Sequence, residues 1–282
     1  MRINTNISSL TAQENAVNTG KNINGSLEKL SSGLRINKAS DDASGLAIAD
    51  KLRTQATSIN QGVDNGNSAI TLLQIADKSM AEQSNILDTI KAKLIQANTD
   101  TTSDSGRSAI ANDVAKLLEQ LNNIAEQTNY NGTYLLQASA SSSAASSALS
   151  FQVGETSSDT ISLAAVQSNT GGLSLATLKT SVDAGGLTKT LAASQQAVVN
   201  SAIDTLNTNR GKIGSTQNQV DSAVRNLMTQ ATNVKAAESI IRDVDYAKES
   251  SNFNKQNIVA QAGSYAISQA NSVQQNVLRL LQ

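Results

Sequence analysis

Two adjacent carboxylates, Asp41 and Asp42, are the residues whose types and spacing come closest to an acid–base site. Paired carboxylates can act as general acid and general base in catalysis. Here, however, they stand just before a helical pattern, where negative charge interacts favourably with the helix dipole. The role of helix-start acids is therefore strongly favoured, and the pair predicts no catalytic site.

The composition removes the usual partners of such chemistry. The chain of 282 residues has His 0 and Cys 0, so the commonest general base, imidazole metal ligands and thiolate nucleophiles are missing. We therefore predict that the protein is not an enzyme and binds no metal or cofactor. The net charge of -1 gives no basic field for nucleic acid.

Hydroxyl groups are the remaining candidates for chemistry. Residues 138–148 consist only of Ala and Ser, which cannot bury much apolar surface and predict an exposed, mobile loop. Hydroxyls on such a loop could accept O-linked sugars, and an unmodified loop is an equally weighted alternative. The candidate acceptors are Ser139, Ser141, Ser142, Ser143, Ser146 and Ser147.

The elements that position these residues are predicted to be long helices. Pro is 0, so no helix has to stop, and aromatic residues make up only 2% of the chain, so Leu, Ile, Val and Ala must form the contacts. The N-terminus lacks a basic start followed by an apolar run, which predicts no secretory signal. No window approaches the roughly 18 apolar residues of a membrane span, so no membrane insertion is expected.

Apolar residues recur at helical spacing over residues 1–33, 44–98, 188–241 and 247–282. The two inner seams each continue for about five heptads, which is typical of coiled-coil packing. We expect these two helices to pack side by side. A further helix after the turn cluster at 98–106 is expected to fold back antiparallel on the first of them.

Short strands interrupt the helices in the middle of the chain. Asn131-Gly132 is a tight-turn signal, and residues 149–153 and 160–163 alternate apolar and polar side chains, which predicts a β-hairpin. The predicted fold class is therefore mostly α, a long antiparallel coiled-coil helical rod with a small central β-hairpin region and a terminal helix pair. In domains, 1–40 and 243–282 form the two halves of a terminal helical domain. The rod comprises 41–137 (N-terminal helices), 138–187 (variable and hairpin region) and 188–242 (C-terminal long helix).

A hinge separates the terminal helices from the rod. Gly33 is placed to end the first helix with a left-handed cap, and Ser40 or Ser44 is placed to cap the next helix. Substitutions at the hinge are expected to alter the registry of packed copies before they alter folding of the rod. The hinge residues are Gly33, Leu34, Arg35, Asp41 and Asp42.

The terminal helices carry apolar stripes, yet an isolated pair so rich in Ala, Asn and Gln is marginally stable. We therefore expect these helices to order mainly when they pack against other copies of the chain. The predicted self-association residues are Ile3, Ile7, Leu10, Val17, Leu27 and Leu30 in the first helix, and Val259, Ala262, Ala266, Val273, Val277 and Leu280 in the last.

Five motifs resemble one known family. Leu-Ser-Ser-Gly-Leu-Arg-Ile-Asn at 30–37, followed by Asp-Asp-Ala-Ser-Gly-Leu-Ala-Ile-Ala at 41–49, closely resembles the N-terminal signature of bacterial flagellins. Similar matches follow in order at 127–132, 242–247, 261–263 and 275–281. No large insert separates the hairpin from the returning helix, so the chain resembles a short flagellin without the large outer variable domains.

The resemblance implies a structural subunit that self-polymerises into the helical flagellar filament used for motility. It places 1–33 and 247–282 in an inner tube and the long helices in a surrounding shell. The implied partners are other copies of the chain, the flagellum's own type III export apparatus, an export chaperone at the C-terminal helix, and the filament cap and junction proteins. Unfolded export to the extracellular filament would account for the missing signal peptide.

Two alternatives and one departure accompany this interpretation. The hook–filament junction protein shares terminal motifs with flagellin, and a non-polymerising coiled-coil adhesin or binding module would share the heptads. In many flagellins, a vertebrate innate receptor recognises Arg at the place of Thr89, Leu at Lys93 and Glu at Asp113. All three residues differ here, so weak or absent receptor activation is expected.

Overall fold

The computed structural model describes residues 5–280, without the side chains of Gln274 and residues 277–280. The chain is mostly helical and packs into two units, unit 1 (Met1–Ala56 with Thr232–Gln282) and unit 2 (Thr57–Ala231). Within residues 5–280, none of the helices has a stretch both long and apolar enough to cross a membrane. The elements in order are α1 (Ile7–Ser32), α2 (Ala43–Ala97), α3 (Asp104–Gln127), β1 (Asn129–Tyr130), β2 (Thr133–Tyr134), β3 (Leu149–Gln152), β4 (Thr160–Leu163), α4 (Ala176–Asp183), α5 (Lys189–Arg242) and α6 (Tyr246–Leu280).

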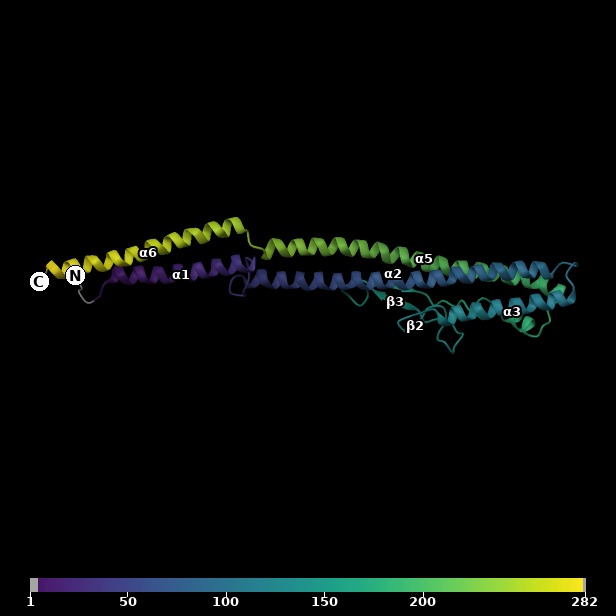
Figure 1. Ribbon diagram of the computed structural model, residues 1–282. Helices are drawn as coiled ribbons and strands as arrows, with labels where there is room; N and C mark the ends of the chain where they lie inside the picture. The colour runs from purple at the N-terminus through teal and green to yellow at the C-terminus, as the bar shows by residue number, and fades with distance from the viewer. Residues whose placement is uncertain (1–4, 281–282) are drawn as a thin grey trace. The chain divides into compact units, whose positions relative to one another are not determined.

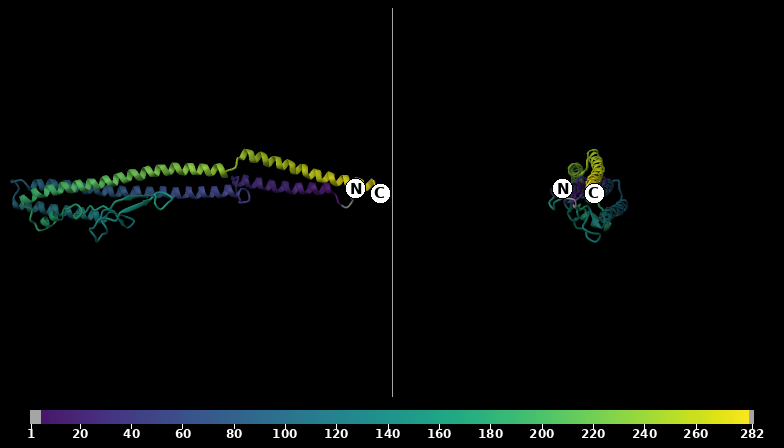
Figure 2. Two further views of the ribbon diagram at one scale, coloured as in Figure 1. Left: turned by 180° about the vertical axis from the view of Figure 1, so that it is seen from behind. Right: turned by 90° about the vertical axis from the view of Figure 1, so that its left-hand side faces the viewer.

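In unit 1, α1 and α6 lie side by side and antiparallel (Figures 1 and 2). The Asn6 side-chain amide donates to the Ala270 carbonyl at 2.9 Å near one end of the pair. Near the other end, the Asn252 amide lies 3.4 Å from the Ser26 hydroxyl. These two contacts set the register of the pair.

The connection between α1 and α2 begins with a C-terminal cap on α1 and ends with an N-terminal cap on α2. Gly33 adopts the predicted left-handed conformation at φ 73°, and its N–H donates to the Lys29 carbonyl at 3.0 Å. The predicted cap of the next helix is wrong, because neither Ser40 nor Ser44 accepts its first N–H groups. Instead, the Asp42 carboxylate accepts from the Gly45 N–H at 2.8 Å, the usual N-cap geometry.

In unit 2, α2 runs antiparallel to both α3 and α5, as the seams predicted (Figure 1). The Asp77 carboxylate on α2 and the Arg210 guanidinium on α5 form a half-buried ion pair at 2.9 Å. Toward α3, the fully buried Gln83 amide donates to the Leu121 carbonyl at 3.0 Å. Large side chains buried in this core include Leu73, Met80, Leu87, Ile90, Leu94, Leu118 and Leu206.

Two glycines one helical turn apart let α2 approach its neighbours closely. A Cβ added at Gly62 would lie 2.5 Å from the main-chain oxygen of Val153, at the end of the hairpin. A Cβ at Gly66 would lie 2.4 Å from a methyl carbon of Val224 on α5. Between them, the Asn65 amide donates to the Gln152 carbonyl at 3.1 Å. The hairpin therefore rests directly on the α2 backbone.

The predicted hairpin forms, and a second two-stranded antiparallel sheet flanks the predicted Asn-Gly turn. In the β3–β4 hairpin, Leu149 pairs with Leu163 and Gln152 pairs with Thr160. The β1–β2 pair is joined by the predicted Asn131-Gly132 turn, in which both residues have positive φ (49° and 82°).

Two features of the central region were not predicted. The helix α4 lies between two glycine pairs, and its Leu178 and Val182 are buried. The Ala–Ser segment, residues 138–148, is exposed over most of its length as predicted, but it also turns back on itself, with the Ala138 N–H donating to the Ala144 carbonyl at 2.9 Å. The side-chain amide of Asn169 donates to the Ser143 carbonyl at 2.7 Å and anchors the segment.

Candidate self-association surface and hinge

The predicted apolar stripe of α1 is largely exposed in the single chain. Ile7 is 63% exposed, Leu10 55%, and Val17 and Leu27 each 54%. Ile3 lies outside the described residues. Such a row of large apolar side chains on one surface is unusual for a chain that remains alone in water.

The face of α1 that packs on α6 is a different one. Buried or half-buried positions recur along α1 with heptad spacing, and most carry small or polar side chains. Leu30 belongs to this packed row and not to the exposed stripe, which corrects its predicted place. The row consists of Ser9, Ala12, Ala16, Thr19, Ile23, Ser26 and Leu30.

The same division holds on α6. The predicted residues Val259 (45% exposed) and Val273 (53%) face solvent, and Ala262 and Ala266 are exposed beside them. The side chains of the predicted residues Val277 and Leu280 lie outside the described part of the chain. Ile258 and Tyr265 on α6, which are not among the predicted self-association residues, are still more exposed, at 66% and 74%. The half-buried row is Glu249, Phe253, Gln256, Ala260, Gly263, Ile267 and Ala270.

Helix geometry separates the two rows. At 3.6 residues per turn, Ile7, Leu10 and Val17 lie on the side of α1 roughly opposite to its packed row, and Ile258 and Tyr265 do so on α6. Leu27, Val259 and Val273 flank the packed rows.

Small residues such as Ala260 and Gly263 allow α1 and α6 to approach closely, and the large members of the packed rows are Ile23, Leu30, Phe253 and Ile267. Between Lys255 and Arg279 the chain also has no Asp, Glu, Lys or Arg. The pair therefore presents two outward apolar faces, and that of α6 is uncharged.

The hinge residues join the two breaks in unit 1. Leu34 forms an isolated antiparallel bridge with Asp243. The Arg35 N–H donates to the Arg242 carbonyl at 2.6 Å, and the Val244 N–H donates to the Gly33 carbonyl at 3.0 Å. The α1–α2 connection is thus held to the α5–α6 connection through main-chain hydrogen bonds.

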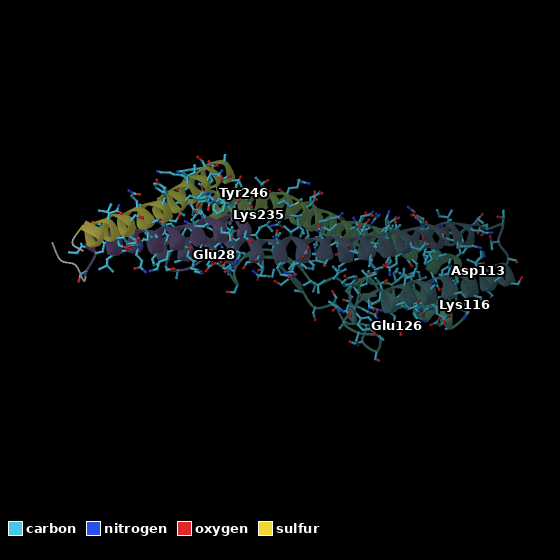
Figure 3. All side chains as sticks on the ribbon, turned by 60° about the vertical axis from the view of Figure 1, so that its left-hand side comes forward. Glu28, Asp113, Lys116, Glu126, Lys235 and Tyr246 are labelled. Atoms are coloured by element: carbon cyan, nitrogen blue, oxygen red, sulfur yellow. The ribbon has the colours of Figure 1, made fainter. Side chains whose placement is uncertain are left out.

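Side chains reinforce the hinge from both connections. The Arg35 guanidinium donates twice to the Ile241 carbonyl, at 2.5 and 3.2 Å. A Cβ at Gly33 would lie 3.0 Å from the hydroxyl oxygen of Tyr246, the first residue of α6 (Figure 3). The mostly buried Arg242 side chain lies 3.7 Å from the Asp50 carboxylate. Substitution at Gly33 would therefore strain the backbone and displace the start of α6.

Two carboxylates hold the loop that follows Gly33. Asp41 accepts the main-chain N–H groups of Lys38 and Asn37, which lower the pKa of its carboxyl group. On α1, Glu28 (Figure 3) accepts from the Lys38 ammonium at 2.7 Å and the Asn37 amide at 2.8 Å. These hydrogen bonds lower the pKa of Glu28, and Glu28 in turn raises the pKa of Lys38. Asp41 and Asp42 thus act as loop and helix-cap acids rather than as a catalytic pair.

The lowered pKa values predict that acid releases this loop. A carboxylate with a depressed pKa contributes stability that is present above its unfolded-state pKa and lost as the pH falls through the folded-state value. In the assembled filament, we expect amide-exchange protection of the Asn37 and Lys38 N–H groups to fall on acidification. An Asp41→Ala variant should lack this protection already at neutral pH. Protection that stays constant from about pH 6 to pH 2 would contradict the assignment.

The predicted receptor-patch residues lie on α2 and α3. Lys93 forms a salt bridge with Asp113 at 2.9 Å, and the Thr89 hydroxyl donates to the Asn85 carbonyl at 2.9 Å, one turn earlier on α2. Of the three patch residues, Lys93 and Asp113 therefore form a direct ion pair, whereas the Thr89 hydroxyl bonds within its own helix.

The candidate hydroxyls divide by burial. Ser141, Ser143 and Ser147 are exposed, and Ser139 and Ser142 are half-buried. Ser146 is buried, and its hydroxyl accepts from the Val166 N–H at 3.0 Å. The prediction of Ser146 as a sugar acceptor is therefore wrong, because its hydroxyl is buried and already hydrogen-bonded.

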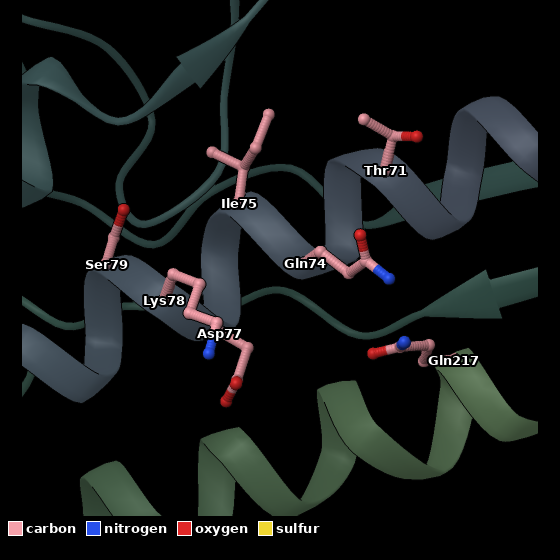
Figure 4. A pocket seen from close by; sticks show the side chains of 7 residues that line it. All are labelled: Thr71, Gln74, Ile75, Asp77, Lys78, Ser79 and Gln217. Atoms are coloured by element: carbon pink, nitrogen blue, oxygen red, sulfur yellow. The ribbon is translucent and has the colours of Figure 1, made fainter.

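A surface hollow of about 580 Å³ lies along α2 and α5 in unit 2. Gln74 and Gln217 point toward each other across it, with Asp77 and Lys78 nearby (Figure 4). Arg210 on α5 already forms an ion pair with the Asp77 carboxylate on α2, so Asp77 stabilises the packing of these two helices.

Comparison with protein families gives two matches. The model described as bacterial flagellin N-terminal helical region matches residues 3–141, and the model described as bacterial flagellin C-terminal helical region matches residues 196–281. The hairpin and α4 fall between them.

Curated relatives match the whole chain or part of it. Flagellin of Bacillus subtilis is 34% identical over 303 residues, with 100% of both chains covered. Flagellin of Halalkalibacterium halodurans is 33% identical, also over 100% of both chains. Flagellin B of Helicobacter pylori is 48% identical over 160 residues, which cover 57% of this chain and 30% of the relative.

Solved structures show the same architecture. The crystal structure of Bacillus cereus flagellin matches with a TM-score of 0.50 and 27% identity, covering 62% of this chain and 94% of that one. A putative flagellar hook-associated protein from Vibrio parahaemolyticus matches with a TM-score of 0.57, covering 72% of this chain and 99% of that one. At 11% identity, the second likeness shows the fold alone.

Proposed function

Because the chain belongs to the bacterial flagellin family and is a structural subunit of the flagellar filament, we propose that copies join through the outward faces of α1 and α6. The observation that carries this proposal is the position of the large apolar side chains. They lie outside or beside the α1–α6 contact and are between 45% and 74% exposed in the single chain. The hook–filament junction protein and the non-polymerising adhesin or binding module are not favoured, since full-length relatives are flagellins.

Burial of the two stripes supplies the driving force. Apolar surface removed from water contributes roughly 25 cal/mol per Å², which offsets the entropy lost on ordering. The outer faces of two packed helices point in opposite directions, so the α1 face of one copy can meet the α6 face of the next. Contact between unlike faces does not close at two copies and generates rings or helical filaments.

A charge placed in the exposed stripe tests the proposal. Val17→Glu should prevent polymerisation, because burying an unpaired charge at an interface costs roughly 3–5 kcal/mol. Asn22→Glu is the matched control, since it adds the same charge to an exposed polar position outside the stripe. For both variants, light scattering and electron microscopy after seeding measure how much filament forms. Normal filaments from Val17→Glu would contradict the proposed interface.

The terminal helices are proposed to order during assembly. In the monomer, fast amide exchange should be confined to about residues 1–40 and 243–282, because this pair is rich in Ala, Asn and Gln and buries little large apolar surface. Protection of both segments in the monomer would contradict this part of the proposal.

The remaining partners follow from the family. We propose secretion through the flagellum's own type III apparatus, with an export chaperone on α6 and with the filament cap and junction proteins at the filament ends. The exposed Ile258, Val259 and Tyr265 support α6 as the chaperone site, since an unassembled copy needs these side chains covered. Weak or absent innate-receptor activation stays a prediction.

We propose O-linked sugars on the exposed part of the Ala–Ser segment. The acceptors are Ser141, Ser143 and Ser147, which are exposed, with Ser139 and Ser142 as partly accessible alternatives. The intact mass of native filament protein should exceed that of the bare chain. A mass equal to the bare chain would end the proposal.

A further inference from the structure

The turn between β1 and β2 combines an unhindered amide with an unhindered nucleophile. Asn131 and Gly132 are both exposed and form the whole two-residue turn. Space around Gly132 is open, since an added Cβ would meet nothing within 4 Å. Among residues 5–280, no hydrogen bond holds the Asn131 side-chain amide or the Gly132 N–H.

We propose that Asn131-Gly132 is a site of spontaneous deamidation. The Gly132 main-chain nitrogen attacks the side-chain carbonyl carbon of Asn131 and loses its proton, and the side-chain nitrogen leaves as ammonia. The product is a five-membered succinimide. Water then opens the ring at either carbonyl, giving aspartate or isoaspartate. The net change is amide plus water to acid plus ammonia, so no oxidant, metal or enzyme takes part.

The same dipeptide also occurs at Asn24-Gly25 in α1 and, in a protected setting, at Asn65-Gly66 in α2. At Asn65-Gly66, the Asn65 amide is held by the Gln152 carbonyl at 3.1 Å. Gly66 is buried against α5, and its nitrogen lies inside the long helix α2. Attack there needs local opening of the helix, which lowers the reactive population. The two sites share local chemistry and differ only in structure.

Conversion at Asn131 would alter the β1–β2 pair that follows α3. Either product places a negative charge in the turn, and isoaspartate also adds one main-chain carbon. The two-residue loop sets the pairing of Asn129 with Tyr134 and of Tyr130 with Thr133. A longer loop cannot keep that register, so copies that carry isoaspartate lose this small sheet.

Peptide mapping by mass spectrometry tests the proposal on the full chain. Native protein is incubated at mildly alkaline pH in ¹⁸O-labelled water, and amide-to-acid conversion is followed at both sites. Conversion at Asn131 should exceed that at Asn65 by roughly tenfold or more, because opening a packed helix is rare. The products should include isoaspartate carrying the label. In denaturant the two rates should converge.

Three results would overturn the proposal. They are absence of conversion at Asn131 in the native protein, equal native rates at Asn131 and Asn65, and formation of aspartate without isoaspartate. An Asn131→Gln variant provides a further check, because its longer side chain would have to form a less favoured six-membered ring. Its retained helical circular dichroism would show that the lost reactivity is local.

Discussion

Removal of residues 247–282 should abolish filament formation and leave unit 2 helical. The deletion takes away α6 with its whole exposed stripe, so no copy can offer the second of its two outward faces. Unit 2 keeps α3 and its buried core, including Leu87 and Leu121, because none of their packing partners lies in the deleted segment. Electron microscopy after seeding measures polymerisation, and far-ultraviolet circular dichroism measures the helices.

The thermal unfolding of the truncated chain is the control. A cooperative transition would show that the loss of filaments does not arise from a collapsed core. Filaments of native symmetry from the truncated chain would show that α6 is not required and that the assignment of the outward faces is wrong.

Gly62→Ala should lower the free energy of unfolding by about 1–3 kcal/mol, the usual range for overpacking a filled site. The new methyl group would lie 2.5 Å from the Val153 main-chain oxygen. A carbonyl oxygen cannot rotate away as a side chain can, so either the hairpin or α2 must shift. Urea denaturation followed by circular dichroism measures the change.

Gly211→Ala is the matched control for Gly62→Ala. Gly211 lies in α5, is exposed, and an added Cβ there meets nothing within 4 Å. Replacing an unhindered helical glycine by alanine stabilises a helix by up to about 1 kcal/mol. The two variants should therefore move the free energy of unfolding in opposite directions. If both variants changed the free energy of unfolding in the same direction and by the same amount, the close approach of the hairpin to α2 would not contribute to stability.

Helix positions and the hairpin were predictable from the sequence because their signals are long or chemically simple. The seams of α2 and α5 continue for many turns without proline, and the alternation at 149–153 and 160–163 is typical of strands. The Gly33 cap follows from the freedom of glycine at positive φ. Each of these signals lies within one segment of the chain, so each predicts local structure without knowledge of which other helix or strand packs against that segment.

The partners themselves were not predictable in the same way. Periodicity located the apolar side of α1 and α6, but it could not show that the two helices meet through their small residues. Ala260 and Gly263 give almost no hydropathy signal, and their value lies in letting two backbones approach. Leu30 was assigned to the wrong row for this reason.

Local ambiguity explains the other misses. Ser40, Asp42 and Ser44 are all competent caps within one turn, and only the position at which α2 begins selects Asp42. In the same way, composition cannot show which serine of an Ala–Ser run turns inward, as Ser146 does.

The stretch of α6 between Lys255 and Arg279 without acidic or basic side chains has a consequence for where such a filament can operate. Contacts made by this surface contain no charge pairs for dissolved ions to screen, so fresh water and brine should leave their strength nearly the same. Apolar contact also strengthens with moderate warming instead of weakening. In the proposed interface, α6 therefore contributes no carboxylate or amine between Lys255 and Arg279 that salt could screen or acid could titrate, and the hinge carboxylates remain the acid-sensitive part of the same unit.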